Sequence, residues 1–311
     1  MVNNQAGVAD NAAEMVAGRL AEEGKEAGRG ALSGKAPGEA HGQQGQEGQQ
    51  GEVVIEVRDL TNRFGRQVVH HKLNLDVYRG EILGVIGGSG SGKSVLLRSI
   101  VGLQTPASGN VRVLGEDFSS LAPERRGALE RRFGVLFQAG ALFSSLTVVE
   151  NIAVPLIENA GLDRPEAEHL AEVKLALAGL PANAGGKYPA ALSGGMVKRA
   201  ALARTLALDP DILFLDEPTA GLDPIGAAEF DQLILTLRDA LGFTVFLVTH
   251  DLDTLYTICD RVAVLSDKHV LAADKLDVVE AIEDPWVQAY FNGPRGRAAK
   301  KANRQLTTEA H

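Results

Sequence analysis

A glycine-rich turn decides the fold. Residues 87–94 read Gly87-Gly88-Ser89-Gly90-Ser91-Gly92-Lys93-Ser94 and fit the pattern G-x-x-x-x-G-K-[ST]. An apolar strand pattern precedes this turn and a helical pattern follows it. Glycines let backbone N–H groups curl around an anion, and the start of a helix adds its positive end. We therefore expect Lys93 to reach the terminal phosphates of a nucleotide and the Ser94 hydroxyl to ligate magnesium. A merely flexible glycine turn is the alternative, which the strand and helix on either side disfavour.

An acidic pair follows a second apolar strand pattern at residues 211–215. Asp216 and Glu217 stand at its C-terminal end, just before Pro218. Ligand sites of parallel sheets lie at that edge, so the strand is expected to aim both carboxylates at the phosphates. Asp216 is predicted to hold magnesium and Glu217 to act as general base on the attacking water. Alone, the pair is also explained as a strand cap; beside the glycine-rich turn it indicates a nucleotide site.

Strand and helix patterns alternate along the chain, which predicts an α/β fold with a mostly parallel core sheet. Residues 53–57 alternate like an edge strand, which adds an antiparallel β edge. Residues 144–207 carry helical patterns without a good strand and are predicted to form a helical insertion. We expect one domain over residues 52–293.

The two ends differ from this domain in composition. Residues 1–51 are rich in Gly and Gln and are predicted to be disordered, with a short partner-binding helix as the alternative. Residues 294–311 carry five basic residues against one acidic residue and are predicted to form a basic flexible tail. Such a tail can contact anionic lipid, although a solvated tail is the simpler expectation.

Overall composition excludes some functions. The 311 residues carry 31 Lys and Arg against 40 Asp and Glu, a formal net charge of -9, which argues against nucleic acid as the main partner. No apolar run approaches the roughly 18 residues of a membrane-spanning helix, so we expect the chain not to cross a bilayer by itself. His70, His71 and His269 are expected at the surface, and Cys259 and Trp286 are expected to serve packing.

A second helix start resembles a phosphate site. Residues 192–196 read Leu192-Ser193-Gly194-Gly195-Met196 and enter a helical pattern. If both phosphate-shaped turns lie on separate lobes, one chain cannot place them on one phosphate, whereas a head-to-tail dimer can. At this point the chain resembles an ABC-transporter ATPase subunit, whose signature these residues match.

Further motifs of that family follow in order. Gln138 stands where the family has its Q-loop, residues 220–223 match the D-loop, and His250 matches the switch histidine. Phe64 stands where the family usually has a tyrosine that stacks on adenine. The resemblance, over about residues 53–293, implies an ATPase that uses ATP and Mg²⁺, with Gln138 in catalysis and at the metal and His250 on the γ-phosphate. An ordinary surface glutamine and a satisfied core histidine remain the structural alternatives for these two residues.

Three stretches, residues 137–156, 192–199 and 284–293, resemble the ATPase of Mla-type (MCE) phospholipid transporters. This resemblance implies an ATPase homodimer at the cytoplasmic face of a bacterial inner membrane, bound peripherally to a multi-span permease and working with an MCE-type substrate-binding protein. Other transport substrates (an amino acid, a metal or a solvent) and a non-transport ABC ATPase of DNA repair or translation are the alternatives. The two tails depart from the family, so no function is transferred to them.

Overall fold

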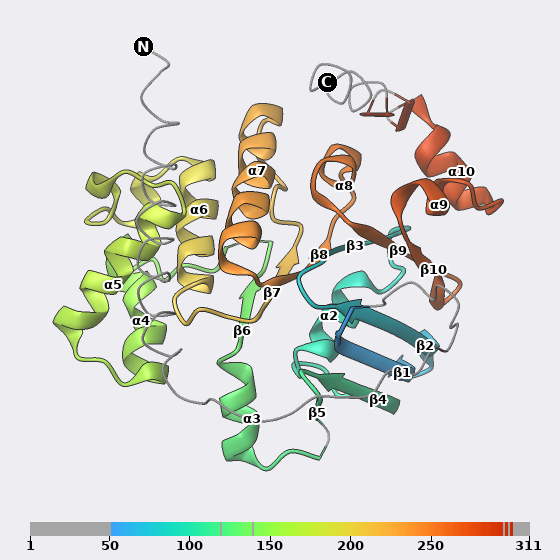
Figure 1. The fold of residues 1–311 in the computed structure, drawn as a ribbon, viewed down its shortest axis with the longest axis horizontal. Coiled ribbons are helices and arrows are strands. Elements are labelled where there is room, and N and C mark those ends of the chain that lie inside the picture. Colours follow the sequence, from blue (N-terminus) through green and yellow to red (C-terminus); the bar gives the residue numbers. More distant parts are fainter. Residues whose placement is uncertain (1–50, 119, 139, 295, 298, 301–311) are drawn as a thin grey trace, which may run out of the picture. The chain divides into compact units, whose positions relative to one another are not determined.

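The computed structural model describes residues 51–118, 120–138, 140–294, 296–297 and 299–300 (Figure 1). The tail predicted for residues 1–51 lies outside this part except for Gly51, and so do residues 301–311 of the basic tail. Those two predictions stay predictions.

Four strands near the start of the described chain form an antiparallel sheet with the order β2-β1-β4-β5. They are β1 (Val53–Phe64), β2 (Gln67–Tyr78), β4 (Ser108–Val113) and β5 (Glu116–Asp117). β1 pairs on both sides and is therefore internal to its sheet, not the edge strand that its first five residues predicted. Its alternation arises because one face of this sheet is buried and the other is exposed.

A second sheet has six strands in the order β10-β9-β3-β8-β7-β6, in which all neighbours are parallel except the β10–β9 pair. They are β3 (Ile82–Gly87), β6 (Phe133–Leu136), β7 (Ile212–Asp216), β8 (Thr244–Val248), β9 (Arg261–Ser266) and β10 (His269–Asp274). β7 and β8 are buried along their whole length, which explains their unbroken apolar sequence.

The helices begin and end at recognisable signals. Thr147 and Glu150 form a capping box at the start of α4, and Gly242 closes α7 in the left-handed conformation. The helices are α2 (Lys93–Ile100), α3 (Pro123–Glu130), α4 (Val148–Ala160), α5 (Arg164–Leu177), α6 (Gly194–Thr205), α7 (Pro224–Leu241), α8 (Leu252–Ile258), α9 (Leu276–Glu280) and α10 (Pro285–Asn292), with 3₁₀ turns η1 (Ala182–Ala184) and η2 (Pro189–Ala191). None of the helices within the described residues combines the length and the apolar composition that spanning a membrane requires.

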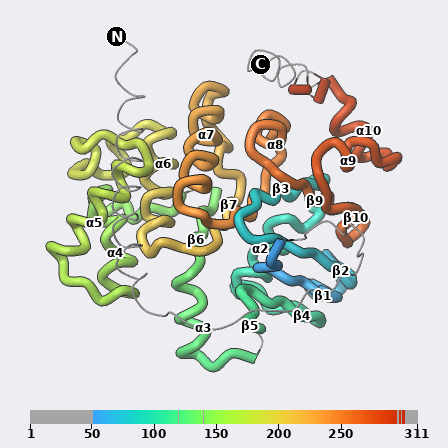
Figure 2. The backbone as a smooth tube through the Cα atoms, viewed as in Figure 1, coloured from blue at the N-terminus to red at the C-terminus, as the bar shows by residue number. Residues whose placement is uncertain are grey.

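Buried side chains divide into clusters on the two faces of the parallel sheet. On one face, α2 packs between the sheet and the antiparallel strands through Leu96, Leu97 and Ile100. On the other face, α7 contributes Phe230 and Ile234. The helices α4, α5 and α6 form their own core beyond β6, between β6 and β7 in the chain (Figures 1 and 2). Both faces of the sheet are thus covered by other elements. A ligand site can therefore lie only at the ends of its strands.

The packed chain continues past Gly293, where the domain was predicted to end. Ala299 is buried with the α8, α9 and α10 side chains, and the Lys300 ammonium pairs with the Glu280 carboxylate. The boundary at residue 293 is therefore too early, because a basic composition does not reveal that Ala299 meets an apolar surface.

Candidate nucleotide-binding site

The residues expected at the site come from neighbouring strands. β3, β8, β7 and β6 are adjacent and parallel, so their C-terminal ends share one edge of the sheet. β3 leads into the glycine-rich turn at Gly87, β8 into His250, β7 into Asp216 and Glu217, and β6 into Gln138. The strand order thus gathers residues that are far apart in the sequence at one edge of the sheet.

The turn between β3 and α2 has a backbone that requires glycine. Gly90 and Gly92 have φ angles of 78° and 97°, which side chains rarely adopt. Gly92 is the N-cap of α2, and no side chain caps the helix there. The free N–H groups of the first turn of α2 are therefore left for an anion.

Lys93 and Ser94 begin α2 and turn toward the acidic strand end. The Lys93 ammonium donates to the carbonyl oxygens of Gly87 and Gly88 at 2.8 and 3.3 Å. Burial lowers its pKa, which the nearby Glu217 and Asp216 carboxylates oppose. The Ser94 hydroxyl donates to Asp216 Oδ1 at 3.1 Å.

The Ser94 and Asp216 oxygens fit magnesium. Mg²⁺ prefers oxygen ligands and is usually held by one or two protein groups together with substrate phosphates and water. Asp216 is only 7% exposed, which limits competition from bulk water. The hydroxyl–carboxylate pair beside the phosphate-shaped turn therefore suits this metal.

Glu217 and His250 contact each other. His250 Nδ1 lies 2.7 Å from Glu217 Oε2, with the Glu217 side chain 17% and the His250 side chain 69% exposed. Glu217 also has a φ of 51°, in the left-handed region, and its N–H donates to the Val248 carbonyl oxygen at 2.9 Å. Strained backbone of this kind costs of order 1–3 kcal/mol and persists where the surroundings impose it, often at functional sites.

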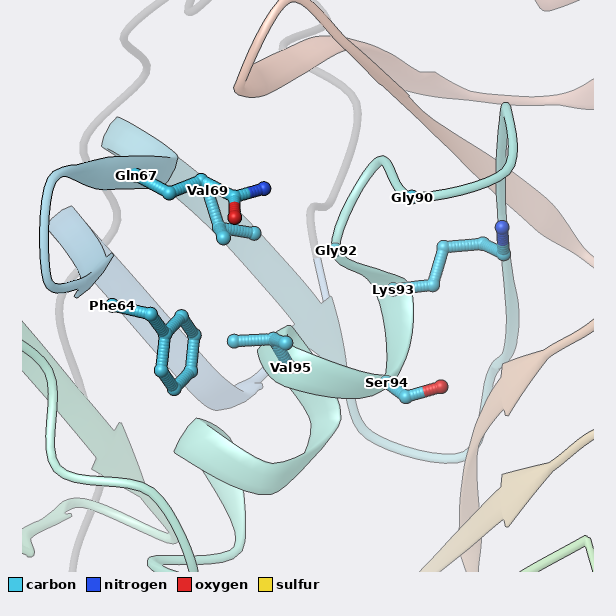
Figure 3. A pocket seen from close by; sticks show the side chains of 8 residues that line it. All are labelled: Phe64, Gln67, Val69, Gly90, Gly92, Lys93, Ser94 and Val95. Atoms are coloured by element: carbon cyan, nitrogen blue, oxygen red, sulfur yellow. The ribbon is translucent and has the colours of Figure 1, made fainter.

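Phe64 lines a pocket beside the turn. The pocket has a volume of about 390 Å³ and is also lined by Gln67, Val69, Gly90, Gly92, Lys93, Ser94 and Val95. Figure 3 shows the Phe64 ring near Val95, while Lys93 and Ser94 extend away from it. The ring is 45% exposed. An exposed aromatic face next to a phosphate-shaped loop can stack on a nucleobase.

Gln138 is exposed just beyond β6, and its backbone is held by a residue that the sequence analysis missed. The buried Lys198 ammonium, on α6, donates to the Gln138 carbonyl oxygen. Burial lowers the pKa of Lys198, and Glu217 opposes this shift. The sequence did not indicate this role for Lys198, because most lysines in a helix are exposed to solvent.

The Ser-Gly-Gly turn lies apart from the glycine-rich turn. Ser193 is the N-cap of α6 and accepts from the Met196 N–H at 3.3 Å. A Cβ added at Gly194 would meet nothing within 4 Å, and one at Gly195 only the tip of Leu222 at 4.0 Å. Figure 1 places α6 well away from α2, with α7 and the sheet between them. One chain does not bring the two turns together.

His70 is buried under the glycine-rich turn, so its expected place at the surface was wrong. Its side chain has no exposure, and a Cβ added at Gly92 would lie only 2.3 Å from its Nε2 atom. Asn62 Nδ2 donates to His70 Nδ1 at 3.0 Å and also to the Ser99 hydroxyl. Burial lowers the pKa of His70 to about 4. The histidine is therefore neutral at pH 7 and supports the turn from below.

This burial predicts an acid-sensitive contribution to stability. Protonation is disfavoured in the folded state, so stability is lost as the pH falls from about 6.5 toward 4. Between pH 7 and pH 4.5 we expect the wild type to lose about 2 kcal/mol more free energy of unfolding than His70→Gln, which cannot titrate. Urea unfolding of both proteins at the two pH values measures the difference. Equal losses would show that His70 is not held neutral.

Comparisons with known proteins identify the family of this chain. A family model described as "ABC transporter" matches residues 70–220. The chain is 37% identical over 262 residues to the "Probable ribonucleotide transport ATP-binding protein mkl" of Mycobacterium leprae, covering 83% of this chain and 75% of the relative. It is also 37% identical over 240 residues to the "Intermembrane phospholipid transport system ATP-binding protein MlaF" of Escherichia coli K12, covering 77% of this chain and 89% of that protein.

Solved structures confirm the predicted fold class. The ATP-binding cassette MJ0796, a dimer in a post-hydrolysis state bound to ADP and Pi, is 31% identical with a TM-score of 0.65 and covers 71% of this chain and 98% of its own. cbiO1 from Clostridium perfringens is 28% identical with a TM-score of 0.67, covering 80% of this chain and 99% of its own. Together, the motifs, the strand edge and these relatives show that the chain belongs to the ABC transporter family, as one of its ATP-hydrolysing cassettes.

Proposed function

We propose that this chain is the ATP-hydrolysing subunit of a phospholipid transporter. The observation that carries the proposal is the 37% identity to MlaF, which extends over 89% of that protein, combined with the convergence of Lys93, Asp216, Glu217 and His250 at one strand edge. The identity supports the substrate class and the convergence supports the chemistry.

The chemistry follows from where the side chains lie. Lys93 and the first turn of α2 bind the β- and γ-phosphates, and Phe64 stacks on the adenine. Ser94 and Asp216, with Gln138, would hold magnesium, and the metal would supply positive charge that neutralises the phosphates. Glu217 takes the proton of the attacking water. His250 orients Glu217 and contacts the γ-phosphate.

The working unit in this proposal is a head-to-tail dimer. Ser193, Gly194 and Gly195 lie open at the start of α6 and away from the chain's own α2, so they are available to a second copy. The related cassette MJ0796 forms dimers. ATP held between the glycine-rich turn of one subunit and the Ser-Gly-Gly turn of the other favours the closed pair, and hydrolysis removes that contact.

The relative MlaF supports the proposed partners, because its name places it in an intermembrane phospholipid transport system. The dimer binds peripherally to a multi-span permease at the cytoplasmic face of the inner membrane and works with an MCE-type substrate-binding protein. Helices α4 to α6, which follow Gln138, transmit closure to the permease. The division into a tail over residues 1–51 and a cassette with a helical part over residues 144–207 belongs to this proposal.

A second substrate class has its own support, because the mycobacterial relatives are named for ribonucleotide transport. The test is to purify the full chain with its membrane partners and identify the bound molecules by mass spectrometry. We expect phospholipid in the complex, and faster ATP turnover when phospholipid is supplied. Bound ribonucleotide beyond the ATP site, with no phospholipid, would favour the second class.

A further inference from the structure

Helix α10 lies across two loops of the nucleotide site, and the proposed chemistry gives it no role. Val287 and Phe291 anchor it, with 0% and 1% exposure, in a cluster that contains Ile86 of β3 and Leu255 of α8. The Asp284 carboxylate caps its start by accepting from the N–H groups of the next two helical residues after Pro285. α10 is thus fixed on the strand and the helix next to the site loops.

Two aromatic side chains on α10 face those loops. The Trp286 and Tyr290 rings are stacked, with centroids 4.9 Å apart and an interplanar angle of 16°. The Tyr290 hydroxyl donates to the backbone carbonyl oxygen of His250 at 3.0 Å. The Trp286 indole Nε1 lies 3.4 Å from where a Cβ on Gly88 would stand, and this side chain lines a second hollow with residues 88–91. One aromatic pair therefore bonds to the His250 backbone and lies beside the glycine-rich turn.

Electrostatics also connects Tyr290 to the site. Burial raises the pKa of Tyr290, and the Asp251 and Glu217 carboxylates raise it further. The phenol thus stays protonated and remains a donor to His250. The His250 side chain, 69% exposed, contacts Glu217, while its backbone carbonyl oxygen accepts from Tyr290, so Tyr290 touches the residue that carries the imidazole.

We propose that Trp286 and Tyr290 are positioning residues for ATP hydrolysis. They fix the position of the His250 backbone relative to the first glycines of the turn. His250 and Glu217 are thereby placed to meet the γ-phosphate together. The inference rests on the roles of His250 and Glu217 proposed above. It assigns Trp286, expected only to pack, a function in the site.

Substitutions of Tyr290 and Trp286 in the full chain are expected to have different kinetic effects. Tyr290→Phe removes only the hydroxyl and is expected to lower kcat about 3- to 10-fold with KM for ATP within twofold, the size of one lost hydrogen bond. Trp286→Leu, which loses the contact with the turn, is expected to raise KM by about 2- to 10-fold. Tyr78→Phe is the matched control, because Tyr78 stands at the opposite end of β2 from the pocket-lining Gln67. Thermal unfolding should be the same for Tyr290→Phe and wild type.

A double variant separates this inference from the proposed function. If Tyr290 acts through His250, Tyr290→Phe should change the residual turnover of His250→Ala by less than twofold, measured as phosphate release from radiolabelled ATP. An equal loss in both backgrounds, or a kcat of Tyr290→Phe within twofold of wild type, would overturn the positioning role. Near-normal turnover of His250→Ala itself would instead remove His250 from the proposed chemistry.

Discussion

Glu217→Gln is expected to lower ATP turnover by about 10²- to 10⁴-fold, the usual worth of a general base. Gln fills the same space and can still contact His250, but it cannot take a proton from water. Lys93 and the uncapped start of α2, which are proposed to bind the phosphates, are unchanged in this variant, so ATP binding should persist. With ATP and magnesium the variant should accumulate as a dimer, because the closed pair forms and is not released. Phosphate release and size-exclusion chromatography measure the two effects.

Two further variants serve as comparisons for Glu217→Gln. Glu124→Gln removes a carboxylate from the exposed surface of α3 and should turn over ATP like wild type. Lys93→Ala should fail earlier, at nucleotide affinity or hydrolysis, because it loses the cation that faces the phosphates. If Glu217→Gln keeps near-normal turnover while Glu124→Gln does too, another group is the base.

Ser193→Arg is expected to abolish ATP-dependent closure while each subunit still binds one ATP. The long side chain would enter the space that is open above Gly194, whereas the glycine-rich turn of the same chain is untouched. Mixing this variant with Lys93→Ala should partly restore closure. In the mixed dimer one composite site receives both defects and the other receives neither. Sedimentation of each variant and of the mixture with ATP measures closure.

The alternative is that residues 192–196 serve only as a helix start inside their own chain. In that case the mixture should close no better than either variant alone. Single cysteines placed near Ser193 and Ser89 test the geometry directly, and failure to crosslink between chains in ATP would contradict the head-to-tail dimer. The natural Cys259 should not interfere, because burial raises its pKa and leaves little thiolate.

The site could be predicted largely because its residue types are tied to local backbone. The turn at Gly92 needs a left-handed residue, and β7 must be apolar until Asp216 because both of its faces are buried. Such constraints act on a few consecutive residues, so they can be recognised from the local sequence. The family resemblance then supplied Gln138 and His250, whose surroundings alone left structural alternatives open.

What the sequence could not predict depends on pairings between distant segments. His70 sits in a strand whose alternation permits either face, and only the pairing of β2 with β1 brings it beside Asn62. The position of Trp286 against Gly88 likewise depends on how α10 docks. The internal place of β1 required knowing that β4 pairs on its other side. The periodicity of apolar residues does not reveal any of these contacts, because it does not show which distant segments pair.

The strand order also sets when during synthesis a nucleotide can first bind. β3 carries the glycine-rich turn, yet its partners in the sheet are β8 and β9, with Ile82 opposite Val245 and Leu83 opposite Arg261. Such long-range pairings form late, because the intervening chain must first be made and closed. ATP therefore cannot stabilise the emerging chain until β8 and β9 have left the ribosome. Since a ligand stabilises only the state that binds it, stabilisation by nucleotide requires that the sheet has formed through β9.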